Sequence, residues 1–196
     1  MRQSPRRGKA KSLGLEANLG VEKLDILSAY DVAYALTWDI DILFSNAGIG
    51  EAGPVFEIPM DLVRHNFETN VFAPLNLAQQ FIKKFIDGKK KGKIVFTSSM
   101  GGLFTPVGFG IYVSTKHALE SIAEALQQEV KPYGIQIQTV NPGPYLTGYN
   151  ETMAVHHSVG WMITKTTERK PRSKQHSMRC LVYLKEDWIQ TKLSMQ

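Results

Sequence analysis

Cysteine is almost absent from this sequence, since Cys180 is the only one among 196 residues. A single cysteine excludes an internal disulfide and any metal cluster built on several cysteines. Long apolar runs are also absent: none approaches the ~18 residues that cross a bilayer, so we expect no membrane span. The basic start, MRQSPRRGKAK, lacks the apolar segment that a secretory signal needs. These absences favour a protein of the reducing cytoplasm.

Acidic residues are scarce at both ends of the chain. Residues 1–11 and 161–196 each carry a net charge of +5, whereas residues 12–160 carry −5. Basic ends could bind nucleic acid or another anionic surface, but solvated ends are the favoured interpretation. The length and the hydrophobic fraction of 43% are those of a single globular domain. We therefore expect a domain at 21–155 between irregular segments at 1–20 and 156–196.

Hydrophobic periodicity predicts alternating strands and helices. Short β-branched or aromatic runs predict strands over 21–26, 41–45, 94–96 and 135–140. Amphipathic stretches predict helices over 29–38, 60–86 and 112–130. Ser28 can cap the first helix, and Pro74 should interrupt the second. Strands that alternate with helices in this order are typical of an α/β fold with a parallel sheet.

Residues 93–116, KIVFTSSMGGLFTPVGFGIYVSTK, bring reactive side chains together. A strand ends in hydroxyl residues, a glycine-rich loop follows, and Tyr112 and Lys116 then share one face of a helix, four residues apart. An ammonium beside a phenol favours the tyrosinate, so we expect the pKa of Tyr112 to fall below ~10. A Tyr four residues before a Lys also arises by chance. The order of the whole stretch is more specific than the pair.

This order resembles the short-chain dehydrogenase/reductase family, which places a Ser 13 residues before a Y-x-x-x-K pair. Counting back 13 residues from Tyr112 reaches Ser99. The resemblance implies a Rossmann-like doubly wound parallel sheet and NAD(P)-dependent carbonyl reduction or alcohol oxidation, with NAD and NADP both open. It implies that Tyr112 is the proton donor or base and that Ser99 polarises the substrate oxygen. Lys116 would lower the pKa of Tyr112 and bind the nicotinamide ribose.

Further motifs extend the resemblance. Asn46-Ala47-Gly48 matches the family's N-A-G motif, although a simple β-turn is the alternative, and Asn70 matches the helix Asn that supports a proton relay. The implied catalytic set is Asn70, Ser99, Tyr112 and Lys116. A P-G-x-x-x-T loop and an Asp near the adenine complete the cofactor side. The implied cofactor-binding set is Asp25, Asn46, Ala47, Gly48, Tyr112, Lys116, Pro142, Gly143 and Thr147.

The substrate side and the assembly also follow from the resemblance. An apolar carbonyl or alcohol is favoured, because the side chains expected there are Met100, Phe104, Val107, Phe109, Tyr145 and Met153. Core packing is an equal alternative for these six. The helices at 60–86 and 112–130 are those through which the family forms dimers and tetramers, so we expect a homo-oligomer.

The resemblance covers about residues 21–150, and the family's opening T-G-x-x-x-G-x-G motif has no counterpart. Gly14 and Gly20 follow no apolar strand and have the wrong spacing. We therefore expect a sheet truncated at its N-terminus, with the family's strands 1 and 2 missing. Strand 41–45 would then lie at a bare edge or pair directly with strand 21–26. The alternative to an enzyme is a non-catalytic remnant that does not bind dinucleotide tightly.

Overall fold

The computed structural model describes residues 22–145, 149 and 153, together with the backbone of 181–184. These residues form a four-stranded sheet with the order β3-β2-β1-β4. The strands are β1 Ile42–Ser45, β2 Lys93–Thr97, β3 Gln136–Val140 and β4 Leu181–Leu184. β1, β2 and β3 are parallel, and β4 pairs antiparallel with β1. The α/β class and three of the predicted strands are confirmed.

The fourth predicted strand, at 21–26, is wrong for the residues that the structure describes. Residues 22–26 form no strand, although Leu24 and Ile26 are buried in the core. We expected β1 either to lie at a bare edge or to pair with strand 21–26. This expectation is also wrong, because β4 pairs with β1 there, with Ser45 opposite Leu181. A strand needs a neighbour for its backbone N–H and C=O groups. With β2 on one side of β1 and β4 on the other, residues 22–26 have no place beside β1.

Helix α2, Ala29–Ala35, begins as predicted and ends three residues early. The Ser28 hydroxyl caps its N-terminus by accepting a hydrogen bond from the backbone in the first turn. At the other end, Lys84 Nζ donates to the carbonyl oxygens of Leu36 and Trp38 at 2.7 and 2.6 Å. These bonds, from a lysine on helix α4, Ala73–Asp87, satisfy carbonyls that follow the end of α2.

The long helix predicted over 60–86 consists of three segments. These are α3 Met60–Phe67, a π-helical segment Glu68–Phe72, and α4 Ala73–Asp87. The backbone N–H of Ala73 bonds to the carbonyl five residues earlier. Pro74 has no N–H and its ring crowds the preceding turn, so the interruption expected there takes the form of a wider turn just before it. The wider turn includes Asn70.

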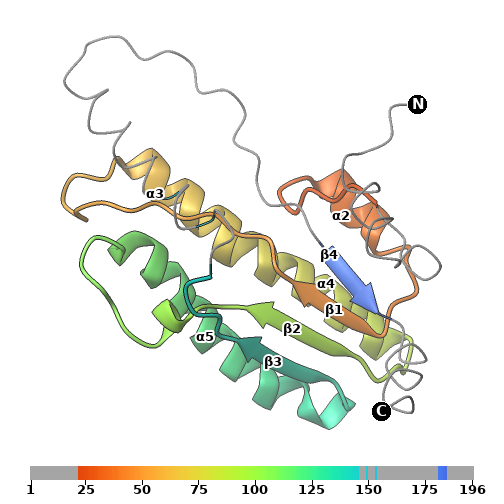
Figure 1. The fold of residues 1–196 in the computed structure, drawn as a ribbon. Helices are drawn as coiled ribbons and strands as arrows, with labels where there is room; N and C mark the ends of the chain where they lie inside the picture. The colour runs from red at the N-terminus through yellow and green to blue at the C-terminus, as the bar shows by residue number, and fades with distance from the viewer. Residues whose placement is uncertain (1–21, 146–148, 150–152, 154–180, 185–196) are drawn as a thin grey trace.

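The core lies between the sheet and its helices. Figure 1 shows α4 and the long helix α5, Gly110–Val130, side by side against one face of the sheet. The largest fully buried side chains are Phe81, Phe85, Phe96, Ile40, Leu43, Leu77, Ile94 and Ile137. Full burial of such a side chain contributes about 1.5–3 kcal/mol. Within the described ranges, no helix is both long enough and apolar enough to cross a membrane.

Candidate active site

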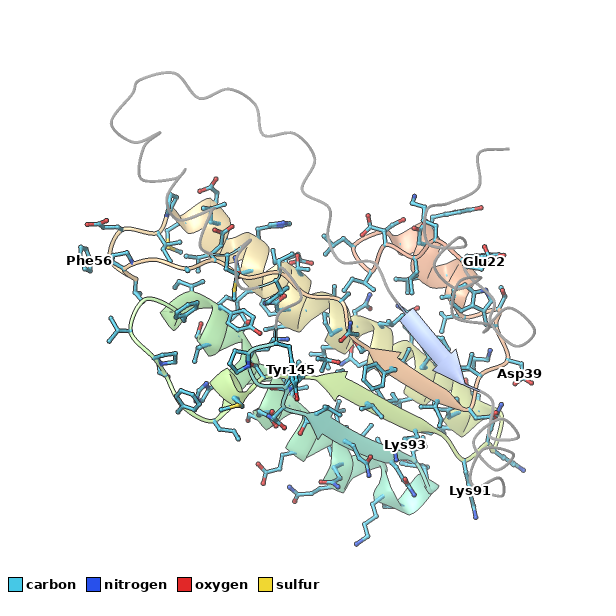
Figure 2. All side chains as sticks on the ribbon, viewed as in Figure 1. Glu22, Asp39, Phe56, Lys91, Lys93 and Tyr145 are labelled. Atoms are coloured by element: carbon cyan, nitrogen blue, oxygen red, sulfur yellow. The ribbon has the colours of Figure 1, made fainter. Side chains whose placement is uncertain are left out.

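A cavity of about 540 Å³ lies at the carboxyl ends of the parallel strands. These ends meet at one edge of the sheet, and α5 begins beside them; Tyr145 marks this edge in Figure 2. The predicted site residues that line the cavity are Asn46, Gly48, Ser99, Tyr112, Lys116, Pro142 and Gly143. The fold therefore brings together residues that lie almost 100 positions apart in the chain.

Ser99 is placed by the turn that ends β2. Its backbone leaves the strand in an extended conformation and begins a short 3-10 turn, in which its Oγ accepts a hydrogen bond from the Gly101 N–H at 3.1 Å. The Ser99 carbonyl accepts a hydrogen bond of 3.1 Å from the Asn141 side chain, which also donates to the Glu120 carboxylate. Ser99 and Tyr112 line the same cavity, and the Ser99 hydroxyl lowers the pKa of Tyr112. The bonds to Gly101 and Asn141 therefore fix the turn that presents the Ser99 hydroxyl to the cavity.

Lys116 is a buried cation at the base of the cavity. Its side chain is 4% exposed, and its Nζ donates to the Thr97 carbonyl at 2.8 Å. The Nζ lies 5.7 Å from the centroid of the Tyr112 ring, one helical turn earlier. Burial lowers the pKa of Lys116 from 10.5 to about 8, although the nearby Glu120 carboxylate acts in the opposite direction. The ammonium therefore keeps its proton at pH 7 and loses it in mildly alkaline solution.

The pKa of Tyr112 is raised, so the expectation that it falls is wrong for this structure. Burial is the largest cause, because it disfavours the tyrosinate. Hydrogen bonds with Ser99 and Tyr149 lower the pKa by a smaller amount. The spacing of Tyr112 and Lys116 predicted their common face, but it contained no information about burial.

Asn70 connects two parts of the site from the π-helical segment. Its Oδ1 accepts from the Ile49 N–H at 2.9 Å, and its Nδ2 donates to the Ile49 carbonyl at 2.7 Å and to Thr115 Oγ1 at 3.0 Å. Thr115 lies on α5 between Tyr112 and Lys116. The buried amide therefore ties the loop after β1 to the helix that carries the tyrosine and the lysine.

The N-A-G motif forms the loop after β1, as its position in the sequence predicts. Asn46 and Gly48 line the cavity, whereas Ala47 packs against the core. A Cβ atom at Gly48 would lie 3.3 Å from Asn70 Oδ1 and 3.7 Å from Lys116 Nζ. The absence of a side chain at Gly48 therefore leaves the space beside the lysine open.

The other predicted cofactor residues divide into three groups. Pro142 and Gly143 line the cavity, and a Cβ at Gly143 would lie only 3.0 Å from the Met100 sulfur. Asp25 is not among the lining residues; its backbone and carboxylate form the turn before α2, where the Leu27 N–H donates to its Oδ1 at 3.2 Å. Thr147 lies outside the described residues.

Apolar side chains form most of the remaining cavity wall. Five of the six expected on the substrate side line it: Met100, Phe104, Phe109, Tyr145 and Met153. Val107 does not line it and is 100% exposed. That loop borders a separate hollow with residues 52–56, at the end of the molecule that Phe56 marks in Figure 2.

Tyr149 is a site residue that the sequence patterns missed. Its ring centroid lies 6.1 Å from that of Tyr112, and its hydroxyl lowers the pKa of Tyr112. Tyr149 precedes Met153 by four residues, and both line the cavity. That helical spacing was the one available signal.

A family model for short chain dehydrogenases matches residues 4–157. This chain therefore belongs to the short-chain dehydrogenase family. The match starts well before residue 21, where the similarity in motifs begins. It includes the strand ends and helices that surround the cavity.

Individual relatives agree with this assignment. An NADPH-dependent 3-dehydrocapnine reductase of Ornithobacterium rhinotracheale is 35% identical over 111 residues, which cover 55% of this chain and 39% of the reductase. Retinol dehydrogenase 8 of Homo sapiens is 33% identical over 141 residues, which cover 69% of this chain and 44% of that enzyme. The chain thus spans about two fifths of the length of these curated relatives.

The fold is also that of solved dehydrogenases. A 4-hydroxyisoleucine dehydrogenase mutant complexed with NADH and succinate is similar, with a TM-score of 0.65 and 26% sequence identity. The similarity covers 78% of this chain and 65% of that one. The Rossmann-like class expected from the motifs is confirmed.

Proposed function

We propose that this chain carries the proton-transfer centre of an NAD(P)-dependent oxidoreductase that interconverts a carbonyl and an alcohol. One observation carries the proposal. The side chains of Ser99 and Tyr112 line one apolar cavity, where the Ser99 hydroxyl lowers the pKa of Tyr112, and the buried Lys116 lies one helical turn from Tyr112. Family membership and relatives whose names include NADH or NADPH support the choice of cofactor.

Polar groups at the base of the cavity fit the nicotinamide ribose of that cofactor. Lys116 has three N–H donors, and one is used by the Thr97 carbonyl. Thr97 also lines this cavity, but its hydroxyl oxygen is buried and has no hydrogen-bond partner within the described part of the chain. Ribose hydroxyls both donate and accept, so Lys116 and Tyr112 would hold them. Asn46, Gly48, Pro142 and Gly143 would border the nicotinamide.

Each catalytic side chain has a distinct task in this proposal. The bound cofactor supplies or accepts the hydride. Tyr112 gives its hydroxyl proton to the substrate oxygen during reduction and takes it back during oxidation. The Ser99 hydroxyl donates a hydrogen bond to the same oxygen and holds it at the phenol. Asn70 would support the relay of protons towards Lys116 through its contact with the Ile49 loop.

The protonation states favour reduction at neutral pH. The pKa of Tyr112 is raised, and that of Lys116 is about 8, so both groups hold their protons at pH 7. Tyr112 is then ready to act as an acid. Alcohol oxidation needs the tyrosinate, so its rate should rise with pH while the rate of carbonyl reduction falls.

The substrate class follows from the cavity wall. Met100, Phe104, Phe109 and Met153 offer apolar surface, whereas Ser99, Tyr112 and Lys116 are among the polar side chains of the wall. Such a wall fits a small apolar ketone, aldehyde or alcohol.

The decisive experiment titrates the folded protein with NADH and with NADPH and follows cofactor fluorescence. Saturable binding, and oxidation of the cofactor by apolar ketones, are expected. The Tyr112→Phe variant should bind the cofactor but lose at least 100-fold in turnover, the range that a proton-transferring side chain contributes. A folded wild-type protein without saturable binding would instead favour the non-catalytic remnant.

Assembly and location complete the proposal. Met60, on α3, and Phe72, in the π-helical segment that follows, are 57% and 54% exposed. A homo-oligomer that covers these two segments would therefore bury apolar surface. Light scattering coupled to gel filtration tests this, and a monomer at micromolar concentration would contradict it.

The single Cys180 fits a reducing compartment, and we propose the cytoplasm, which fractionation of the source cells would test.

A further inference from the structure

Tyr149 places a second phenol against the reactive one. The ring centroids of Tyr149 and Tyr112 are 6.1 Å apart, with their planes at 58°. Both line the same cavity as Ser99, and the hydroxyls of Tyr149 and Ser99 each lower the pKa of Tyr112. Three hydroxyl side chains therefore lie in one cavity, and the motifs account for only two of them.

The capacity of the Tyr112 hydroxyl decides what a third hydroxyl can do. A phenol has one proton to donate and two lone pairs to accept with. When Tyr112 acts as an acid, its own proton must point at the substrate oxygen. Any other hydroxyl that binds the Tyr112 oxygen must then donate a hydrogen bond to one of its lone pairs. After the proton has left, the tyrosinate can only accept.

The two phenols are not equivalent. Burial raises the pKa of both, but negative charge on Tyr112 raises that of Tyr149 further, whereas the bond from Tyr149 lowers that of Tyr112. Tyr149 therefore keeps its proton when Tyr112 loses its own. Lys116 is placed differently, since its Nζ is bound to the Thr97 carbonyl and lies 5.7 Å from the Tyr112 ring centroid.

We propose that Tyr149 is a positioning residue for Tyr112: its hydroxyl donates a hydrogen bond to the Tyr112 oxygen, orients that phenol in the cavity and stabilises the tyrosinate. This inference rests on the proposed function and adds a residue to it. During reduction the O–H bond of Tyr112 breaks and an O–H bond forms on the substrate alkoxide. Tyr149 keeps its proton throughout and donates to the tyrosinate that remains, whereas the single proton of the Ser99 hydroxyl stays directed at the substrate oxygen.

The test is a Tyr149→Phe variant, which keeps the ring and removes the hydroxyl. Tyrosines labelled with ¹³C at Cζ report ionisation by NMR, and the resonance missing from Tyr112→Phe identifies Tyr112. The titration midpoint of Tyr112 should move upward by about one pH unit in Tyr149→Phe, the effect of losing one hydrogen bond to a charged group. A Tyr145→Phe variant removes a hydroxyl from the same cavity and should leave that midpoint unchanged.

A second measurement avoids strongly alkaline solution. At pH 7 the Cζ shift of Tyr112 should differ between wild type and Tyr149→Phe, because a hydrogen bond to its oxygen is lost, and should not differ in Tyr145→Phe. Circular dichroism confirms that each variant is folded. If neither the shift at pH 7 nor the midpoint changes in folded Tyr149→Phe, Tyr149 only fills space and the inference is overturned.

Both readouts are independent of turnover, so the two proposals can fail separately. Changed Tyr112 signals in a protein that binds no NADH or NADPH would keep the role of Tyr149 and refute the enzyme. Where turnover is present, Tyr149→Phe should lower kcat about tenfold with little change in KM, and should shift the pH midpoint for alcohol oxidation upward. Turnover with an unchanged pH profile would refute the role of Tyr149 and keep the enzyme.

Discussion

Replacing Lys116 with methionine should make the stability of the protein respond differently to pH. Lys116 is 4% exposed, and burial lowers its pKa from 10.5 to about 8. Between these two values the unfolded chain binds a proton at this lysine and the folded chain does not. Stability therefore rises with pH across this interval, since unfolding takes up a proton. Methionine keeps much of the length of the side chain but has no proton to lose.

The size of the effect follows from the two pKa values. Each pH unit between 10.5 and about 8 corresponds to about 1.4 kcal/mol, so the full interval corresponds to about 3 kcal/mol. The free energy of unfolding of wild type minus that of Lys116→Met should thus increase by about 2 kcal/mol from pH 7 to pH 9.5. The subtraction cancels other titrating groups, and it also cancels the pH-independent cost of leaving the Thr97 carbonyl without the Lys116 donor.

Urea unfolding at pH 7, 8, 9 and 9.5 measures this difference. Lys116→Gln is a matched control, because it also lacks the charge but keeps an N–H donor for Thr97. It should show the same pH dependence, with a different constant offset. A difference between wild type and Lys116→Met that stays within about 0.5 kcal/mol over this range would refute the lowered pKa of Lys116.

Three other changes test separate parts of the structure. Asn70→Leu should destabilise the protein by about 2–4 kcal/mol in urea unfolding, because it removes three hydrogen bonds and leaves both backbone groups of Ile49 unpaired. The control Asn76→Leu, at an exposed position of α4, should change stability by less than about 0.5 kcal/mol. Equal effects of the two substitutions would contradict the bridging role of Asn70. Glu120→Gln should lower the pKa of Lys116 below about 8, because in the wild type the Glu120 carboxylate stabilises the ammonium. NMR of the Lys116 Cε measures this pKa, and an unchanged value would show that Glu120 has no such influence. Deleting residues 181–184 should speed amide exchange in β1, which would lose a neighbour, but not in β3, on the far side of the sheet; unchanged exchange in β1 would argue against the β4 pairing.

Local sequence patterns were sufficient to predict most of the described strands and the common helix face of Tyr112 and Lys116. The apolar runs that form β1, β2 and β3 are short and bounded by turn residues, so they identify strands without knowledge of their neighbours. The Ser28 cap and the common face of Tyr112 and Lys116 depend on residues only a few positions apart. These are distances over which backbone geometry alone relates one side chain to another.

The errors arose where a distant segment decides the outcome. Residues 22–26 alternate like a strand, but β1 already has β2 and β4 as its neighbours. The apolar residue Val107 is fully exposed, although the resemblance placed it on the substrate side. Local periodicity does not predict which segment pairs with β1, since its partner β4 lies more than 130 residues further along the chain.

The sequence by itself determined the family, the positions of the main strands and helices, and the residues that could exchange a proton. The tertiary structure decided how those residues behave. It buried Tyr112 and Lys116, and so raised one pKa and lowered the other. It also placed Tyr149 against Tyr112 and used β4 to cover the open side of β1. Burial and contact depend on which distant segments pack together, whereas motif spacing describes only neighbours along the chain.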